Sequence, residues 1–260
     1  MKELDIEQFI EDGYLLIRQD ELRDYSSVES AEHFVSNIID LRREMKKFFE
    51  RPLEEKALFK IGHDLDSETK CYYAGWWEKS PYLESRFGID YPLEYYVSRN
   101  FYGSTAEDIC YPSNEGEEVR QIAASLPSQQ TFSFARFLNE YFIIPILREY
   151  SRECGLQRPE PSLQIQTTYY EVQSLLKKHQ DRSFLEGIVG PASGIAIFPG
   201  GGAEKMDASL EAGEVILYTG KQFQKHFQRA PRVPPPLPHA VEAESGRMSL
   251  LFAGWMPSLE

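Results

Sequence analysis

Two residues in the C-terminal half of the chain could bind a metal ion together. His179 and Asp181 are separated by one residue in the stretch "LLKKHQDRSFLEGIVG". On an extended backbone, side chains at positions i and i+2 point to the same side, so an imidazole nitrogen and a carboxylate oxygen can reach a common point. A second histidine from a neighbouring strand would complete a facial triad, which leaves coordination positions open and suits non-haem Fe(II). Taken alone, the pair also fits a surface histidine beside a turn acid.

Two other histidines, His226 and His239, are candidates for the third ligand. His239 follows the proline-rich segment "PRVPPPLP", which we interpret as a stiff loop, and begins a strand. His226 lies in "KQFQKHFQRAPR", which predicts an exposed loop or helix residue, or a residue at the mouth of a pocket. His33 and His63 belong to the helical N-terminal part, where exposed or core-edge positions are expected.

The last predicted strand carries two side chains that could bind an organic acid. Arg247 and Ser249 lie two residues apart in "GRMSLLFAGW", so they share one face of the strand. A guanidinium and a hydroxyl aimed into one cavity would bind a carboxylate through charge-assisted hydrogen bonds. Each residue alone fits an ordinary role, as an exposed arginine at a strand start or a small core residue. The order His-x-Asp, then His, then Arg-x-Ser is what indicates a shared site.

The spacing of apolar residues predicts a chain that is helical first and rich in strands afterwards. Helices are predicted at 6–11 with a stop at Gly13, from Ala31 through Phe48, after Pro52, and around 134–142 with a kink at Pro145 and an end at Gly155. Strands are predicted at 14–18, "LQIQTTYY", "SGIAIFPG", "GEVILYTG" and "GRMSLLFAGW". The aromatic-rich stretch from Lys70 to Tyr111 predicts long loops and short strands. Its large aromatics, with Trp255, are expected in the core more than in a substrate lid.

The composition is that of an ordinary globular protein. The chain has 260 residues, 42% of them hydrophobic, which suits one domain with a substantial core. The formal net charge of −13 argues against broad contact with nucleic acid or a membrane surface, since both require a basic face. Three cysteines without paired spacing, and no segment of signal-peptide or membrane-span character, predict a soluble protein in a reducing compartment, expected to be the cytoplasm. The sequence predicts nothing about the oligomeric state.

The order of the motifs resembles the Fe(II)- and 2-oxoglutarate-dependent oxygenases, in particular the isopenicillin N synthase-like branch. "PHAV" around His239 is similar to the family's distal histidine motif, and "GEVILYTG" to the strand before it. "TYY" resembles the family's "NYY" strand, with Thr168 in place of asparagine and Tyr170 kept. "FFERPLEEKALF" and "FIEDGYLLIR" resemble the family's N-terminal helix pair and opening strand. The resemblance covers nearly the whole chain and is weakest between Lys70 and Gln130.

The resemblance implies an α+β fold, with a double-stranded β-helix (jelly-roll) core and flanking N-terminal helices. We expect one oxygenase domain over 1–260, with a mainly helical part at 1–160 and the core with the metal site at 161–260. The implied Fe(II) ligands are His179, Asp181 and His239. The residues implied to face the cosubstrate 2-oxoglutarate are Arg247, Ser249, Tyr170 and Thr168.

The activity implied is oxidation of a C–H bond of a small molecule by O2, with release of succinate and CO2. Hydroxylation of an amino-acid-like compound or a natural product is the expected reaction, and desaturation or ring closure would use the same chemistry. Halogenation is disfavoured because related halogenases lack the carboxylate ligand, and Asp181 is present. Two alternatives stay open: an oxidase or cyclase that uses Arg-x-Ser for its substrate and needs no 2-oxoglutarate, and a metal-binding jelly-roll protein without turnover.

The chain also departs from the resemblance in two ways. The loop from Tyr170 to His179 is shorter than in many members, and the chain ends a few residues after the Arg-x-Ser strand. We therefore expect the aromatic N-terminal region, or a partner subunit, to cover the pocket.

Overall fold

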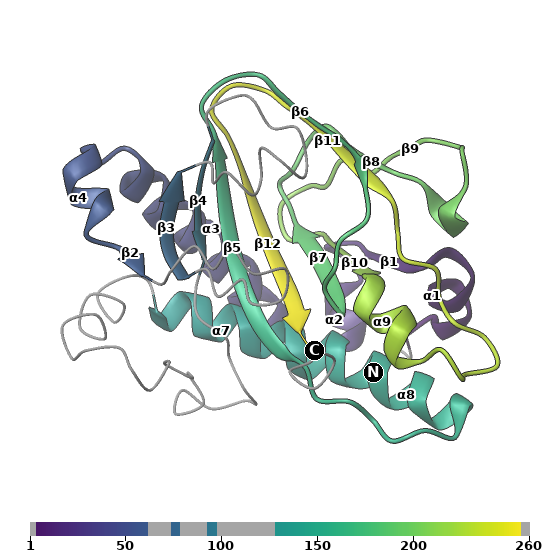
Figure 1. Ribbon diagram of the computed structural model, residues 1–260. Coiled ribbons are helices and arrows are strands. Elements are labelled where there is room, and N and C mark those ends of the chain that lie inside the picture. The colour runs from purple at the N-terminus through teal and green to yellow at the C-terminus, as the bar shows by residue number, and fades with distance from the viewer. Residues whose placement is uncertain (1–3, 62–73, 79–92, 98–127, 256–260) are drawn as a thin grey trace.

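The computed structural model describes residues 4–61, 74–78, 93–97 and 128–255 (Figure 1). Its helices are α1 (Ile6–Asp12), α2 (Leu22–Tyr25), α3 (Val28–Phe49), α4 (Leu53–Ala57), α7 (Ser128–Leu138), the π-helix η2 (Asn139–Ile143), α8 (Ile144–Cys154), the 3-10 helix η3 (Pro199–Gly201) and α9 (Lys221–His226). Its strands are β1 (Tyr14–Ile17), β2 (Lys60–Ile61), β3 (Ala74–Glu78), β4 (Leu93–Val97), β5 (Ser162–Tyr170), β6 (Ser174–His179), β7 (Leu185–Val189), β8 (Ile195–Ile197), β9 (Met206–Asp207), β10 (Val215–Thr219), β11 (His239–Ala243) and β12 (Arg247–Trp255).

The strands form two antiparallel sheets. The larger sheet has the order β1-β10-β7-β12-β5-β4-β3-β2, and the smaller one the order β6-β11-β8-β9. β5 continues into β6, and β11 into β12, over the same end of the molecule (Figure 1). Two antiparallel sheets joined in this way form the predicted jelly roll. The N-terminal half extends the larger sheet at both edges, because β1 pairs with β10 and β4 pairs with β5.

The outer face of the larger sheet packs against helices. α3 passes behind β5 and β12 (Figure 1). The predicted apolar face of α3 is wholly buried: Phe34, Ile38, Leu41, Met45 and Phe48. These side chains share one cluster with the outward-facing residues of β12, Met248, Leu250 and Phe252. The helices therefore hold β12 from behind and leave its other face to the space between the sheets.

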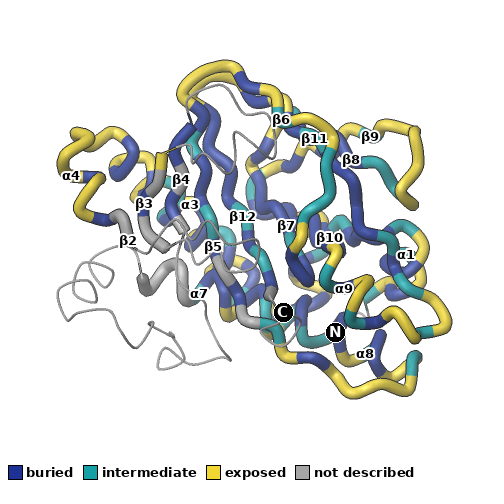
Figure 2. The backbone as a smooth tube through the Cα atoms, viewed as in Figure 1, coloured by how far each residue is buried: buried dark blue, intermediate teal, exposed yellow. Residues whose placement is uncertain are grey.

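The inner face of the larger sheet packs against the smaller sheet through a second cluster. Ile188 and Ile216 from the larger sheet meet Ile195 and Ile197 from the smaller one. The inner strands of this sandwich are buried over most of their length, whereas the edge strands β6 and β9 and most connections are more exposed (Figure 2). Because side chains alternate along a strand, the residues of β12 that lie between the outward-facing ones point toward this interior.

The kink expected at Pro145 takes the form of a π-turn. Residues Asn139–Ile143 form a π-helix between α7 and α8, and Pro145 stands in the first turn of α8. Proline has no amide hydrogen to donate to the preceding turn, so the helix widens for one turn before it resumes. α8 then ends at Gly155, which has a φ of 64° and fulfils the predicted role of C-cap.

The prediction of a loop from Tyr170 to His179 is wrong, because most of it forms strand β6. β6 is an edge strand of the smaller sheet, and its Leu175, Lys177 and Lys178 are exposed. It therefore lacks the apolar alternation from which strands are recognised. β6 ends at His179, so Asp181 follows the strand instead of lying on it, and only the histidine is held by strand pairing.

The proline-rich segment 231–238 packs into the protein, as the interpretation of a stiff loop predicts. Leu237 is fully buried, and its amide donates to the carbonyl of Thr219 over 3.1 Å. A Cβ on Gly13 would lie 2.3 Å from the carbonyl oxygen of Pro235, so only glycine permits this close approach. The segment thus enters β11 along a fixed path and places His239 at the start of that strand.

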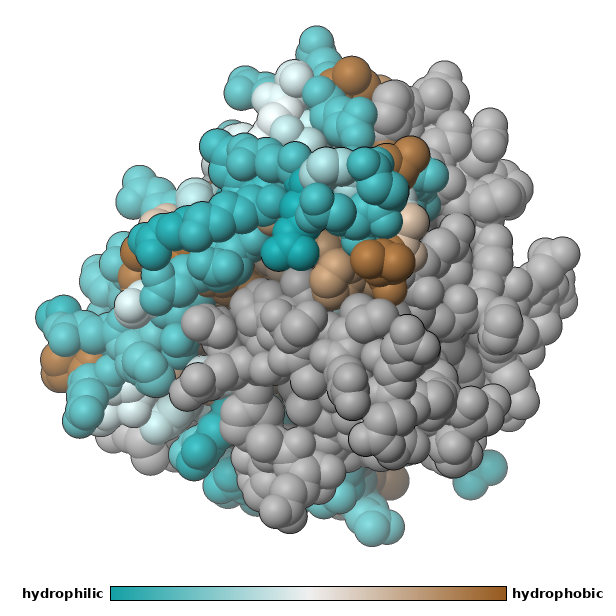
Figure 3. Space-filling model, turned by 90° about the vertical axis from the view of Figure 1, so that its left-hand side faces the viewer, coloured by the Kyte–Doolittle hydropathy of each residue, from teal (hydrophilic) through white to brown (hydrophobic). Residues whose placement is uncertain are grey.

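The helices and the surface of the described residues were compared with what a membrane protein requires. No helix among the described residues is long and apolar enough to cross a bilayer. On the side shown in Figure 3, the described surface is mostly hydrophilic, with hydrophobic residues in small separate groups. Small groups of this kind are normal on protein surfaces.

Candidate metal centre

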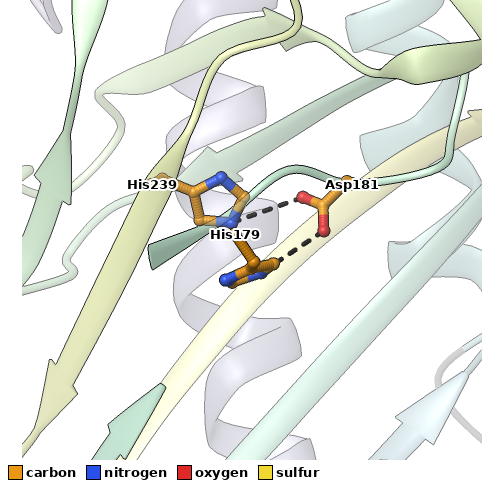
Figure 4. Close-up of side chains that lie close together, drawn as sticks. All are labelled: His179, Asp181 and His239. Carbon is orange, nitrogen blue, oxygen red and sulfur yellow. Dashed lines mark ion pairs between the residues drawn. The ribbon is translucent and has the colours of Figure 1, made fainter. Parts of the chain in front are cut away.

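The structure brings His179, Asp181 and His239 together between the sheets (Figure 4). His179 is the last residue of β6 and His239 the first of β11, and the two residues are directly opposite each other in the antiparallel pairing. Their ring centroids are 4.3 Å apart. Asp181 reaches the same point from the turn after β6, where its carbonyl accepts a hydrogen bond from the amide of Lys221 over 3.0 Å. The ligand atoms of the three side chains all lie within 4.8 Å of one another.

The orientation of the two imidazoles suits a metal ion. His179 Nδ1 lies 2.8 Å from the carbonyl oxygen of Lys177, and His239 Nδ1 lies 3.4 Å from that of Leu237. Carbonyls accept hydrogen bonds, so they favour the proton on Nδ1, and Nε2 is then the nitrogen that carries the lone pair in each ring. These Nε2 atoms lie 3.4 Å and 3.3 Å from the two carboxylate oxygens of Asp181. Lone pairs on nitrogen and oxygen facing one another repel unless a cation lies between them, so the donor set fits Fe(II).

The electrostatics of the site favour the protonation states that bind metal. Burial lowers the pKa of His239 and outweighs the opposite effect of the Asp181 charge, which favours the neutral imidazole. Burial acts to raise the pKa of Asp181, but His239, a hydrogen bond with Glu186 and His179 outweigh it and hold the pKa well below its usual value. Neutral imidazoles and an ionised carboxylate are the forms that coordinate a divalent ion.

Two side chains next to Asp181 were not anticipated from the sequence. The hydroxyl of Tyr218 on β10 lies 3.1 Å from Asp181 Oδ2 and 3.2 Å from Glu186 Oε2 on β7. Burial, reinforced by the charge of Asp181, raises the pKa of Glu186 well above its usual value, which favours the neutral form of Glu186 beside the ionised Asp181. The signal in the sequence was a lone glutamate in the apolar run "FLEGIVG" and a tyrosine in "GEVILYTG". Both residues fix the orientation of the Asp181 carboxylate.

Replacing Tyr218 with phenylalanine is expected to weaken metal binding by about 10-fold, because partners that orient a ligand are typically worth that much or more. The measurement is calorimetric titration with Mn(II) as a redox-stable stand-in for Fe(II). Tyr14→Phe is the matched control, since Tyr14 is directly opposite Tyr218 in the β1–β10 pairing and its hydroxyl contacts the sulfur of Met206. Equal affinities in the two variants would contradict the role given to Tyr218.

The four residues implied to face 2-oxoglutarate form two cross-strand pairs. Arg247 of β12 is opposite Tyr170 of β5, and Ser249 is opposite Thr168. All four are buried. The Arg247 guanidinium carbon lies 5.6 Å from the centroid of the Tyr170 ring. Burial raises the pKa of Tyr170, against the Arg247 charge and a hydrogen bond with Ser249, so the phenol stays protonated and can donate.

Arg247 fits an anionic ligand. None of its three guanidinium nitrogens has a hydrogen-bond partner among the described residues, although all three are buried. A buried charge without partners is costly, and buried cations are normally paired. The carboxylate of 2-oxoglutarate would provide both the charge and the acceptors. The cluster around Arg247 therefore fits the cosubstrate, as the donor set of the metal centre fits iron.

The other candidate residues lie elsewhere or outside the described residues. His226 lies on α9 with its ring against Phe184 and Phe227, at centroid distances of 5.6 Å and 4.8 Å, and is not part of the metal-ligand group. His33 is exposed on α3, and His63 lies outside the described residues. Of the large aromatics singled out, Trp76 is buried in the outer core. Tyr72 and Tyr73 lie outside the described residues, as do the side chains of Trp77 and Trp255.

Comparisons with known proteins identify the fold. No protein-family model matches the chain, and no curated protein matches it. A solved structure described as a 2OG-Fe(II) oxygenase family protein from Caulobacter crescentus is 14% identical, covers 95% of this chain and 78% of its own, and has a TM-score of 0.61. The dioxygenase for auxin oxidation 1 of Arabidopsis thaliana, in complex with 2-oxoglutarate, is 12% identical over 96% of this chain and 85% of its own, with a TM-score of 0.61. A Neurospora crassa protein in complex with alpha-KG and thymine is 12% identical over 96% and 78%, with a TM-score of 0.61.

The chain therefore has the jelly-roll fold of the 2OG-Fe(II) oxygenases. At identities of 12–14% the similarity establishes the fold. The closer resemblance to the isopenicillin N synthase-like branch stays a prediction from the sequence.

Proposed function

We propose that the protein is a non-haem Fe(II)- and 2-oxoglutarate-dependent oxygenase that oxidises a C–H bond of a small molecule. The observation that carries this proposal is the convergence of His179, Asp181 and His239 on one point. The buried, unpaired guanidinium of Arg247 supports the choice of cosubstrate. The structures with this fold include proteins solved with 2-oxoglutarate, and one with thymine.

The three ligands would hold the iron on one face and leave its remaining positions for 2-oxoglutarate and O2. When bound, iron and 2-oxoglutarate supply the chemistry: one oxygen atom of O2 enters succinate as CO2 is lost, and the other hydroxylates the substrate. The chain orients these groups. Tyr218 and Glu186 fix the Asp181 carboxylate, and the backbone carbonyls of Lys177 and Leu237 fix the imidazoles.

The far carboxylate of 2-oxoglutarate would bind Arg247 and Ser249, with the Tyr170 hydroxyl as a further donor and Thr168 beside Ser249. Thr168 Oγ1 already accepts a hydrogen bond from Gln166 Nε2 over 2.9 Å, which orients its hydroxyl. Burial of this cluster excludes water, which strengthens each charge-assisted hydrogen bond. Hydroxylation of an amino-acid-like compound or natural product is the reaction we propose, and retention of Asp181 as a ligand disfavours halogenation.

The experiment that tests this function measures succinate. The protein is loaded with Fe(II) without oxygen and then exposed to air with and without 2-oxoglutarate, across a panel of small metabolites. Succinate and CO2 formed in equal amounts, and only with Fe(II) and 2-oxoglutarate, are the expected result. Oxygen uptake that depends on a metabolite but not on 2-oxoglutarate would instead identify an oxidase. Metal binding without any turnover would indicate a binding protein.

A further inference from the structure

A second arginine, Arg42, lies at the end of β12 that carries Arg247. Arg42 extends from α3, on the outer side of the larger sheet, and its Nη2 donates to the carbonyl oxygen of Met248 over 2.8 Å. Met248 is the residue after Arg247, so the Arg42 guanidinium lies beside the backbone from which the Arg247 side chain departs. The two side chains approach this point from opposite faces of the sheet.

Neither arginine is neutralised by the described part of the chain. Arg42 Nη1 is buried without a hydrogen-bond partner, as are all three guanidinium nitrogens of Arg247. No carboxylate among the described residues forms an ion pair with either. The next residue of α3 behaves differently, since Arg43 is exposed and forms an ion pair with Asp40 at 2.8 Å. The lack of an ion pair at Arg42 is therefore specific to its position beside β12, since the neighbouring Arg43 has one.

The positive charges of Arg42 and Arg247 repel each other. Burial, and then the charge of Arg247, lower the pKa of Arg42 to about 10. Burial also lowers the pKa of Arg247. An uncompensated buried charge costs free energy, and a second one nearby increases the cost. One anion bound at Arg247 would supply the acceptors that the Arg247 guanidinium lacks and would offset the repulsion between Arg247 and the partly buried Arg42.

We propose that Arg42 is a second cation of the cosubstrate site, so that the carboxylate held by Arg247 and Ser249 is stabilised by two positive charges. This inference rests on the proposed function, which names 2-oxoglutarate as the ligand. It implies that the site selects a dicarboxylate whose far end is ionised, and that it rejects analogues with a neutral far end, such as 2-oxoglutaramate. Arg247 supplies the directional hydrogen bonds, and Arg42 adds charge from behind β12.

The test compares the affinity of the Mn(II)-loaded protein for 2-oxoglutarate in four forms by calorimetry. Arg42→Gln removes the charge and leaves a shorter polar side chain, and we expect 2-oxoglutarate binding to weaken about 10-fold, near the lower end of the couplings between close charges because Arg42 lies behind β12. Arg42→Lys keeps the charge and is expected to stay within about 3-fold of the wild type, because the compact ammonium loses only the planar geometry. Arg43→Gln, one residue along the same helix, is the matched control with no change expected.

Each outcome separates the inference from the function on which it rests. If the wild-type protein does not bind 2-oxoglutarate, the proposed function fails. If the wild type binds and Arg42→Gln equals Arg43→Gln, only the role of Arg42 fails. A loss in Arg42→Lys as large as in Arg42→Gln would also overturn it, since the role would then be structural. Arg42→Met, which keeps the aliphatic stem, replaces the glutamine variant if that variant does not fold.

Discussion

Replacing Asp181 with alanine is expected to abolish any 2-oxoglutarate turnover and to weaken metal binding strongly. Asp181 is the one ionised ligand in the group, and its two oxygens face the Nε2 atoms of His179 and His239 at 3.4 Å and 3.3 Å. Its removal leaves two neutral imidazoles and no negative charge to balance the ion. Because loss of a residue that merely orients a ligand costs 10–100-fold, loss of the ligand itself should cost on the order of 100-fold or more in metal affinity.

His226→Ala is the control for this prediction. His226 was the other candidate for the third ligand, and its ring packs against Phe184 and Phe227 outside the metal-ligand group. We expect this variant to bind Mn(II) in calorimetry as the wild type does, with some loss of thermal stability from the disturbed aromatic packing. The reverse pattern, in which Asp181→Ala binds metal and His226→Ala does not, would refute the assignment of the ligands.

The sequence predicted the ligand pair His179 and His239 without predicting why they meet. The motif order located both residues, but only strand pairing explains their contact. β6 is an exposed edge strand without apolar alternation, so the register that places His239 opposite His179 could not be anticipated. Asp181 needed no such information, because two residues of separation keep it near His179 in either a strand or a turn.

The supporting residues were harder to predict, because their roles depend on contacts between segments distant in the chain. Tyr218 and Glu186 lie 32 positions apart and meet because β10 pairs with β7. Arg42 lies 206 positions from Met248, whose carbonyl it contacts. In the sequence each is one polar residue in an apolar or helical run, which also fits an exposed position. The long helix α3 and the strands β1, β5, β10 and β12 were predicted more easily, since burial leaves a periodic pattern or a continuous apolar run. β7, which lies between β10 and β12, was not predicted as a strand, because its short apolar run is interrupted by Glu186 and Gly187.

Replacing Arg247 with methionine is expected to separate ligand binding from stability. The loss of a buried charge-assisted pair with the cosubstrate carboxylate should weaken 2-oxoglutarate binding by on the order of 2–3 kcal/mol. The ligand-free protein should lose little stability or gain some, because the change removes a buried cation with three unpartnered nitrogens and fills its volume with an apolar chain. Calorimetric titration with 2-oxoglutarate measures the first effect, and thermal unfolding without ligand measures the second.

Thermal unfolding in the presence of 2-oxoglutarate measures the change in affinity and the change in stability of Arg247→Met in one experiment. A ligand at 100 times its dissociation constant stabilises the native state by about 2.7 kcal/mol, and this gain should fall below about 1 kcal/mol in Arg247→Met at the same concentration. Arg182→Ala, an exposed arginine next to Asp181, is the control and should keep the full gain. A fall in ligand-free stability with unchanged affinity would make Arg247 a structural residue. The hydroxyls of Tyr170 and Ser249 would then have to hold the carboxylate without a charged group in direct contact with it, which neutral donors in a buried site do poorly.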